Sequence, residues 1–100
     1  CTVVLCGPQT RWRKYVDWEI KATLDKQHGI VALQLPTLPV GPEGRVHVPD
    51  RLFDNISSGY AVWMHWNQLN IQTLNHAIET AISREKWRIS NSRDMRQRNG

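Results

Sequence analysis

Two short apolar runs on either side of a helical segment constrain the fold of this chain most strongly. The first run, residues 2–6, is rich in β-branched side chains and ends at Gly7-Pro8. The second run, residues 29–35, ends at Pro36. Continuous apolar runs of this length are typical of strands covered on both faces, as in a parallel sheet. A strand, a helix and a second strand form a βαβ unit, so we expect parallel strands joined by a right-handed crossover.

The segment between the two runs has the character of a helix. Residues 11–27 contain neither Gly nor Pro. Thr10 is placed to act as the N-cap, because its hydroxyl can accept from the first free amides of the helix. Gly29 is placed to end the helix, since glycine adopts the left-handed conformation that helix C-termini favour.

The rest of the chain predicts a further strand and a last helix. Residues 36–49 are rich in Pro and Gly and indicate a loop, and residues 49–56 could form one helical turn. An aromatic strand is expected over residues 60–66. A helix is expected from Asn67 or Asn70 to about residue 87, because its apolar residues repeat at helical spacing. These elements predict an open α/β sheet.

Composition limits what the chain can be. At 100 residues, with 40% hydrophobic residues and five Trp, it can hold at most one small globular domain. The sequence contains no run that approaches the ~18 apolar residues of a membrane span. Its two cysteines form neither a disulfide framework nor a paired metal site. We therefore expect a cytoplasmic protein. The thin core and the start directly on an apolar strand also predict that the N-terminal part of the fold lies outside this chain.

The net charge of +4 is not spread evenly. Through Ser83, seven Lys and Arg meet seven Asp and Glu, whereas the remaining residues carry six basic and two acidic side chains. We interpret residues 89–100 as a solvated, frayed, basic polar tail. A phosphate-binding arm is the alternative interpretation. Since the body of the chain is neutral, nucleic acid is not an expected partner.

Glu19 is the acidic residue whose position calls for an explanation. At about 100° per residue, Trp12, Tyr15 and Val16 fall within about 60° of Glu19 on a helix, which places its carboxylate inside an apolar arc. An ionised carboxylate there costs several kcal/mol unless it is paired or opens onto a cleft. One interpretation is that Glu19 reaches solvent or pairs with Lys26. The other is a carboxylate at a ligand cleft, with Trp12 and Tyr15 stacking a planar ring.

These residues carry a resemblance to a known family. The buried strand, the turn Gly7-Pro8-Gln9-Thr10, the motif Tyr15-Val16-Asp17-Trp18-Glu19-Ile20 and the second strand resemble the second half of a TIR domain. The chain is most similar to the TIR-like domains of prokaryotic Thoeris-type antiviral defence. The resemblance extends over residues 1–88, as the C-terminal portion of one domain followed by the tail.

The resemblance implies a flavodoxin-like fold with a parallel sheet flanked by helices. It also implies cleavage of the nicotinamide–ribose bond of NAD, which yields ADP-ribose or a cyclised ADP-ribose signal. Glu19 is then the catalytic residue, and Trp12 and Tyr15 bind the substrate. TIR enzymes carry Trp four residues before this Glu, whereas here Tyr15 takes that position and a Trp follows at 18. NAD is the substrate, and neither a cofactor nor a metal is expected.

The resemblance leaves other functions open. Many TIR domains act in assemblies, so a homo-oligomer or a TIR–TIR complex is expected, and a non-catalytic interaction module is the alternative function. A more remote alternative is an enzyme of N-glycosidic bonds related to nucleoside deoxyribosyltransferases. Because the loops that complete the nucleotide pocket of TIR domains lie outside this sequence, we do not expect the chain alone to turn over NAD. Cys6 could be a nucleophile, but a buried structural thiol is the more common state.

Overall fold

The computed structural model describes residues 1–8, 10–38 and 47–97 and contains an open, parallel, three-stranded sheet. The strands lie in the order β1, β2, β3, each in parallel register with the next. An α-helix follows each strand in the sequence. The α/β class and the parallel βαβ unit are therefore confirmed. The elements are β1 (Thr2–Cys6), α1 (Lys14–Asp25), β2 (Ile30–Gln34), α2 (Asp50–Ser57), β3 (Val62–His65) and α3 (Ile71–Ser83), with 3-10 turns at Thr10–Trp12, Trp66–Gln68 and Lys86–Arg88.

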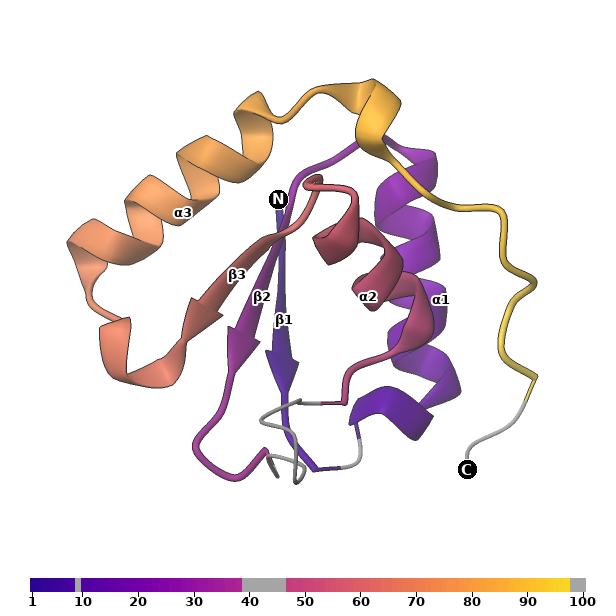
Figure 1. Cartoon of the computed structure of the whole chain (residues 1–100), viewed down its shortest axis with the longest axis horizontal. Helices are drawn as coiled ribbons and strands as arrows, with labels where there is room; N and C mark the ends of the chain where they lie inside the picture. The colour runs from indigo at the N-terminus through magenta and orange to yellow at the C-terminus, as the bar shows by residue number, and fades with distance from the viewer. Residues whose placement is uncertain (9, 39–46, 98–100) are drawn as a thin grey trace.

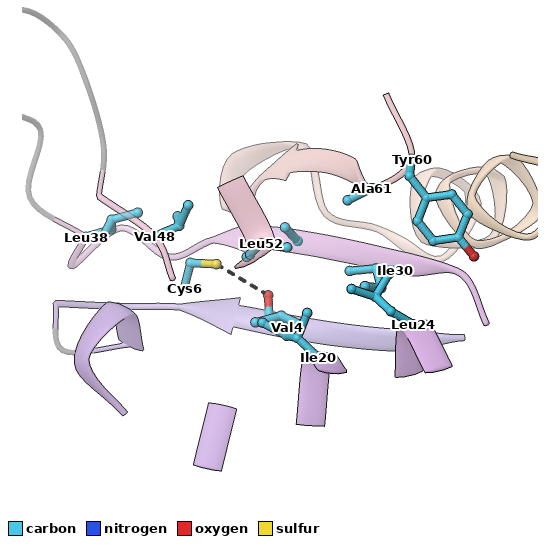
Figure 2. Packing of buried hydrophobic residues seen from close by; sticks show 11 residues of the cluster. Val4, Cys6, Ile20, Leu24, Ile30, Leu38, Val48, Leu52, Tyr60 and Ala61 are labelled. Carbon is cyan, nitrogen blue, oxygen red and sulfur yellow. Dashed lines mark hydrogen bonds between the residues drawn. The ribbon is translucent and has the colours of Figure 1, made fainter. Parts of the chain in front are cut away.

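The sheet separates two helical layers (Figure 1). Helices α1 and α2 cover one face and enclose the larger apolar cluster, which Figure 2 shows from close by. Helix α3 covers the other face and packs chiefly on β2 and β3. Side chains along β2 point alternately to the two faces of the sheet. Ile30 and Ala32 belong to the first cluster, and Val31 and Leu33 belong to the cluster under α3. This explains why the run reads as continuously apolar, since both faces of β2 are buried.

Several predicted boundaries differ from the structure. Helix α1 begins at Lys14 rather than at residue 11, because a separate 3-10 turn precedes it. Thr10 does not cap the helix: its hydroxyl accepts from the amide of Gly7, which precedes the turn, at 2.8 Å. Helix α3 ends at Ser83, since Arg84 adopts extended backbone angles. Asn70 does cap α3, as its side chain accepts from the Thr73 amide at 2.9 Å. Of the predicted loop at residues 36–49, residues 39–46 lie outside the described residues.

Gly29 has a different role from the predicted helix cap. The left-handed residue after α1 is Gln27, with φ of 58°. A Cβ atom at Gly29 would lie only 2.8 Å from the backbone carbon of Ala81 in α3. Glycine is therefore required at this position because α3 passes directly over the chain there, a contact between distant segments that local pattern does not reveal.

A buried ion pair joins α1 to α2. Arg51, which is 1% exposed, donates from Nε to Oδ1 of Asp17 at 2.9 Å. The same guanidinium donates to Oδ1 of Asn91 at 2.8 Å and to the carbonyls of Arg93 and Asp94 at 2.9 and 3.0 Å. One side chain thus holds two helices and the C-terminal segment together.

The C-terminal segment, residues 89–97, is not a frayed tail. It runs along α1 and α2 (Figure 1) and is fixed by hydrogen bonds to both helices. The Asn55 side chain donates to the Ser90 carbonyl and accepts from the Ser90 amide, at 2.8 and 2.9 Å. The Trp18 indole donates to the carbonyl of Arg96 at 2.8 Å, and the Arg96 amide donates to Asp17 at 2.8 Å. The predicted frayed state is therefore wrong for these residues, while the domain boundary at residue 88 stays a prediction.

Cys6 is a core residue. It is fully buried in the cluster that α1 and α2 enclose against the sheet, where its thiol donates to the carbonyl of Val4 at 3.8 Å (Figure 2). Burial raises the pKa of the Cys6 thiol from 9.0 to about 12. Because the thiolate is the reactive species, this environment opposes a nucleophilic role.

Removing the Asp17 carboxylate should strongly destabilise the fold. Asp17→Ala leaves the Arg51 guanidinium buried without its counter-charge, which typically costs about 3–5 kcal/mol. Urea unfolding of the natural protein measures the loss. Lys21→Ala is the control, because Lys21 forms an exposed pair with Asp25 at 3.1 Å and such pairs contribute at most about 1 kcal/mol. Equal effects of the two substitutions would contradict a structural role for the buried pair.

Thiol reactivity should separate the two cysteines. At pH 8, iodoacetamide is expected to modify the exposed Cys1 and to leave Cys6 intact until the protein is unfolded. The raised pKa also has a linkage consequence. The unfolded thiol ionises near pH 9 and the folded one near 12, so the stability that Cys6 contributes is present below pH 9 and is lost as the pH rises toward 12. Rapid modification of Cys6 by iodoacetamide in the native protein, detected by mass spectrometry, would contradict the burial of this thiol.

Candidate functional site

Glu19 reaches solvent, as the first of the two interpretations predicts, and its carboxylate is not buried among apolar side chains. Glu19 is exposed, and its carboxylate has no hydrogen bond or ion pair with any residue that the structure describes, Lys26 included. The buried face of α1 instead consists of Asp17, Ile20, Thr23 and Leu24. Its centre is Ile20, about 100° around the helix from Glu19. The rotation follows from Asp17, which the sequence places on the polar side but which turns inward to meet Arg51.

Tyr15 lies one helical turn before Glu19 and on the same exposed side of α1. It is 60% exposed. Its ring meets the Trp18 ring edge to face, with centroids 5.0 Å apart and an interplanar angle of 84°. The Lys14 ammonium lies 5.2 Å from the Tyr15 centroid and 5.5 Å from that of Trp18. Tyr15 therefore belongs to a small aromatic and cationic group with Trp18 and Lys14, and Glu19 lies one helical turn after Tyr15.

Trp12 lies apart from this group, in the 3-10 turn before α1. Its ring is partly exposed and lies 5.3 Å from the Arg96 guanidinium of the C-terminal segment. Tyr15 packs with Trp18 and Lys14, whereas the Trp12 ring lies against Arg96. That each ring binds substrate stays a prediction.

A hollow of about 340 Å³ lies beside this part of α1, at the carboxyl end of β1. Gly7, Pro8, Thr10, Arg13 and Val16 line it. Ligands of open α/β sheets bind at the carboxyl ends of strands, and the volume lies within the range of about 300–1,000 Å³ for small-molecule pockets. Glu19 is not among the lining residues, although it follows Val16 by only three positions. We define this hollow together with Tyr15 and Glu19 as the candidate site.

Two other hollows have a different character. One of about 420 Å³ lies between α3 and the outer edge of β3 and has no Asp, Glu, Lys or Arg in its lining. The other, about 250 Å³, is polar and surrounds Asp17 and Arg51, whose charges already serve the buried network. The sequence does not reveal the buried hydrogen bonds of Arg51 and Asn55, because the partners lie 34 to 43 residues away along the chain.

The described residues hold no group of three or more His, Cys, Asp or Glu side chains arranged to bind a metal ion. Within the same part of the chain, none of the helices is both long and apolar enough to cross a membrane. The four histidines that the sequence contains are therefore not gathered into a site by the elements described here.

Comparison with known proteins connects this geometry to a family. No curated protein and no solved structure matches the chain. The model of one protein family matches residues 1–39, which hold β1, α1 and β2 and so include Tyr15, Glu19 and the lining of the hollow. Over this segment the chain is similar to the TIR-like domain of the Thoeris protein ThsB.

Proposed function

We propose that this chain is part of a TIR-type enzyme of antiviral defence that cleaves the nicotinamide–ribose bond of NAD, with Glu19 as the catalytic carboxylate. The observation that carries the proposal is the state of Glu19. Its carboxylate has no partner among the described residues, it follows by three positions Val16, which lines the hollow at the carboxyl end of β1, and it falls within the segment that matches the TIR-like family.

A carboxylate at this position suits the chemistry. When the bond between ribose C1′ and the pyridine nitrogen breaks, its electron pair leaves with nicotinamide and positive charge develops on the ribose. A nearby ionised carboxylate stabilises that oxocarbenium-like state and orients the ribose hydroxyls. Water then adds to C1′ and releases its proton to solvent, which gives ADP-ribose. Attack by an adenine nitrogen of the same molecule instead gives a cyclic product.

The neighbouring residues support binding of a nucleotide. Tyr15 presents an exposed aromatic edge one turn from Glu19 and is suited to contact the nicotinamide ring. Arg13 lines the hollow and places positive charge where the diphosphate of NAD would lie. We therefore propose that the nicotinamide ribose faces Glu19 and that the diphosphate lies toward the end of β1.

The site needs a second surface. Electrostatic stabilisation of a developing cation is strongest where water is excluded, whereas Glu19 is exposed in this chain. Closure by further protein surface over Glu19, from the complete protein or from an assembly of copies, is thus part of the proposal. It accounts for the expectation that residues 1–100 alone are inactive.

A non-catalytic interaction module is the second candidate function. It is favoured by the exposed rings on the α1 and α2 side of the sheet, where Tyr15 and Phe53 are 60% and 58% exposed. Exposed aromatic side chains are typical anchors of protein interfaces. In that case Glu19 is an ordinary surface residue.

Nicotinamide release from NAD by the complete natural protein distinguishes the two functions. Glu19→Gln is expected to reduce the rate by about 10²-fold or more, the scale of losing one electrostatic contact in the transition state. The matched control is Glu79→Gln, because Glu79 is an exposed glutamate on α3, across the sheet from the candidate site. Equal activity of the two variants removes Glu19 from catalysis.

The same assay separates the alternative functions. Absence of nicotinamide release under defence-triggering conditions favours the interaction module. Release of bases from nucleosides but not from NAD indicates the deoxyribosyltransferase-like alternative.

A further inference from the structure

The turn that follows α3 exposes an aromatic ring. Trp87 lies in the 3-10 turn Lys86–Arg88 and is 72% exposed, more than any other Trp of the chain. This turn lies at the amino ends of the strands, whereas the candidate site lies at the opposite end of the sheet (Figure 1). A single exposed ring is common on protein surfaces, but this one is held in place from several sides.

The contacts of Trp87 fix the orientation of its ring. The indole Nε1 donates to Oε2 of Glu85, and the Arg88 guanidinium lies 4.5 Å from the ring centroid. Arg88 is fixed in turn, because it donates to the carbonyl of Ser58 at 3.2 Å and to Glu85 at 3.4 Å. A Cβ atom at Gly59 would lie only 3.0 Å from the same guanidinium, so glycine leaves room for Arg88. A ring that is already fixed loses little entropy on binding, which favours it as the anchor of an interface.

Positive charge surrounds this ring. Residues 84–88 carry three basic side chains, and their one acidic side chain, that of Glu85, is already bonded within the turn. Lys86 is exposed, and its ammonium donates to the hydroxyl of the buried Tyr60 at 3.3 Å. Farther along the chain, the charge of Arg93 is balanced by Asp54. We call residues 84–88 the basic turn.

Arg84 is a half-buried cation in the basic turn. Its guanidinium has no hydrogen bond or ion pair with any residue that the structure describes. The Nε atom is fully enclosed, whereas the two terminal nitrogens are not. A guanidinium that is partly removed from water without a counter-charge is costly, and a carboxylate fits its fork of donors. The state of Arg84 therefore indicates an anionic ligand.

We infer that the basic turn binds an acidic segment of a partner protein, with Arg84 and Lys86 meeting carboxylates and Trp87 packing against an apolar side chain. Affinity for nucleic acid comes from many phosphate contacts, whereas this surface offers three cations within five residues and residues 1–83 are neutral. A protein segment needs only a few charged contacts around one aromatic anchor. Because the basic turn lies at the opposite end of the sheet from Glu19, this interaction is separate from the proposed cleavage of NAD.

Calorimetric titration of the complete natural protein with a synthetic peptide of repeating Glu-Glu-Leu tests the inference. We expect saturable binding at low salt with a Kd below about 1 mM. Binding is expected to weaken in about 0.3 M NaCl, because salt screens exposed charges. A matched peptide of repeating Gln-Gln-Leu is expected not to bind. Absence of saturable binding by the acidic peptide, or equal binding of the two peptides, would overturn the inference.

Substitutions in the protein locate the binding surface. Arg84→Gln and Trp87→Ala are each expected to raise the Kd of the acidic peptide by about tenfold or more. The matched controls are Lys21→Gln on α1 and Trp66→Ala at the carboxyl end of β3, where Trp66 is 48% exposed; both are expected to leave the Kd unchanged. Urea unfolding shows whether each variant is folded, and Trp87→Ala removes a largely exposed ring. Equal losses in all four variants would contradict a specific site on the basic turn.

Two further measurements separate the acidic segment from other partners. A single-stranded oligothymidylate is expected to bind more weakly than the acidic peptide, and tighter binding would assign the surface to nucleic acid and overturn the inference. Sedimentation velocity is expected to show the same mass for the natural protein and for Trp87→Ala. Loss of an oligomer in that variant would assign the surface to a second copy instead. None of these readouts uses NAD, so they are independent of whether the proposed activity is found.

Discussion

The buried ion pair between Asp17 and Arg51 decides which side of α1 faces the core. Burying two charges is costly unless the geometry is good and the remaining donors are satisfied. Here the guanidinium meets the carboxylate at 2.9 Å and shares its other N–H groups with Asn91 and with two carbonyls of the C-terminal segment. Helix α1, helix α2 and residues 89–97 are thus joined at one point, and the rotation of α1 is fixed by polar contacts as well as by Ile20 and Leu24.

The solvent exposure of Glu19 follows from that rotation of α1. With Asp17 turned inward, Glu19 and Tyr15 lie on the exposed side of α1, and neither lines the hollow at the end of β1. An exposed carboxylate carries no burial cost in this chain, so the several kcal/mol that the sequence pattern implied do not arise. The proposed chemistry instead depends on closure of the site by another surface.

Features that repeat locally could be predicted from the sequence. The strands β1 and β2 follow from apolar runs of strand length, and the cap of α3 follows from Asn70. Features that depend on distant partners could not. Asp17 appears polar and solvated until Arg51 is placed beside it, and Gly29 appears to be a helix cap until Ala81 passes over it. The candidate site shows the same division: Glu19 and Tyr15 could be identified from their motif, but the direction in which Glu19 points depends on contacts 34 residues away.

A double-mutant cycle on the buried pair tests this account most directly. The free energies of unfolding of the natural protein, of Asp17→Ala, of Arg51→Met and of the double variant give the coupling between the two side chains. Contacting residues in one polar network couple by about 0.5–3 kcal/mol, and the account predicts a value at the upper end of that range, about 2 kcal/mol or more. Additive effects, with a coupling below about 0.5 kcal/mol, would contradict the claim that this pair sets the orientation of α1 and thereby of Glu19.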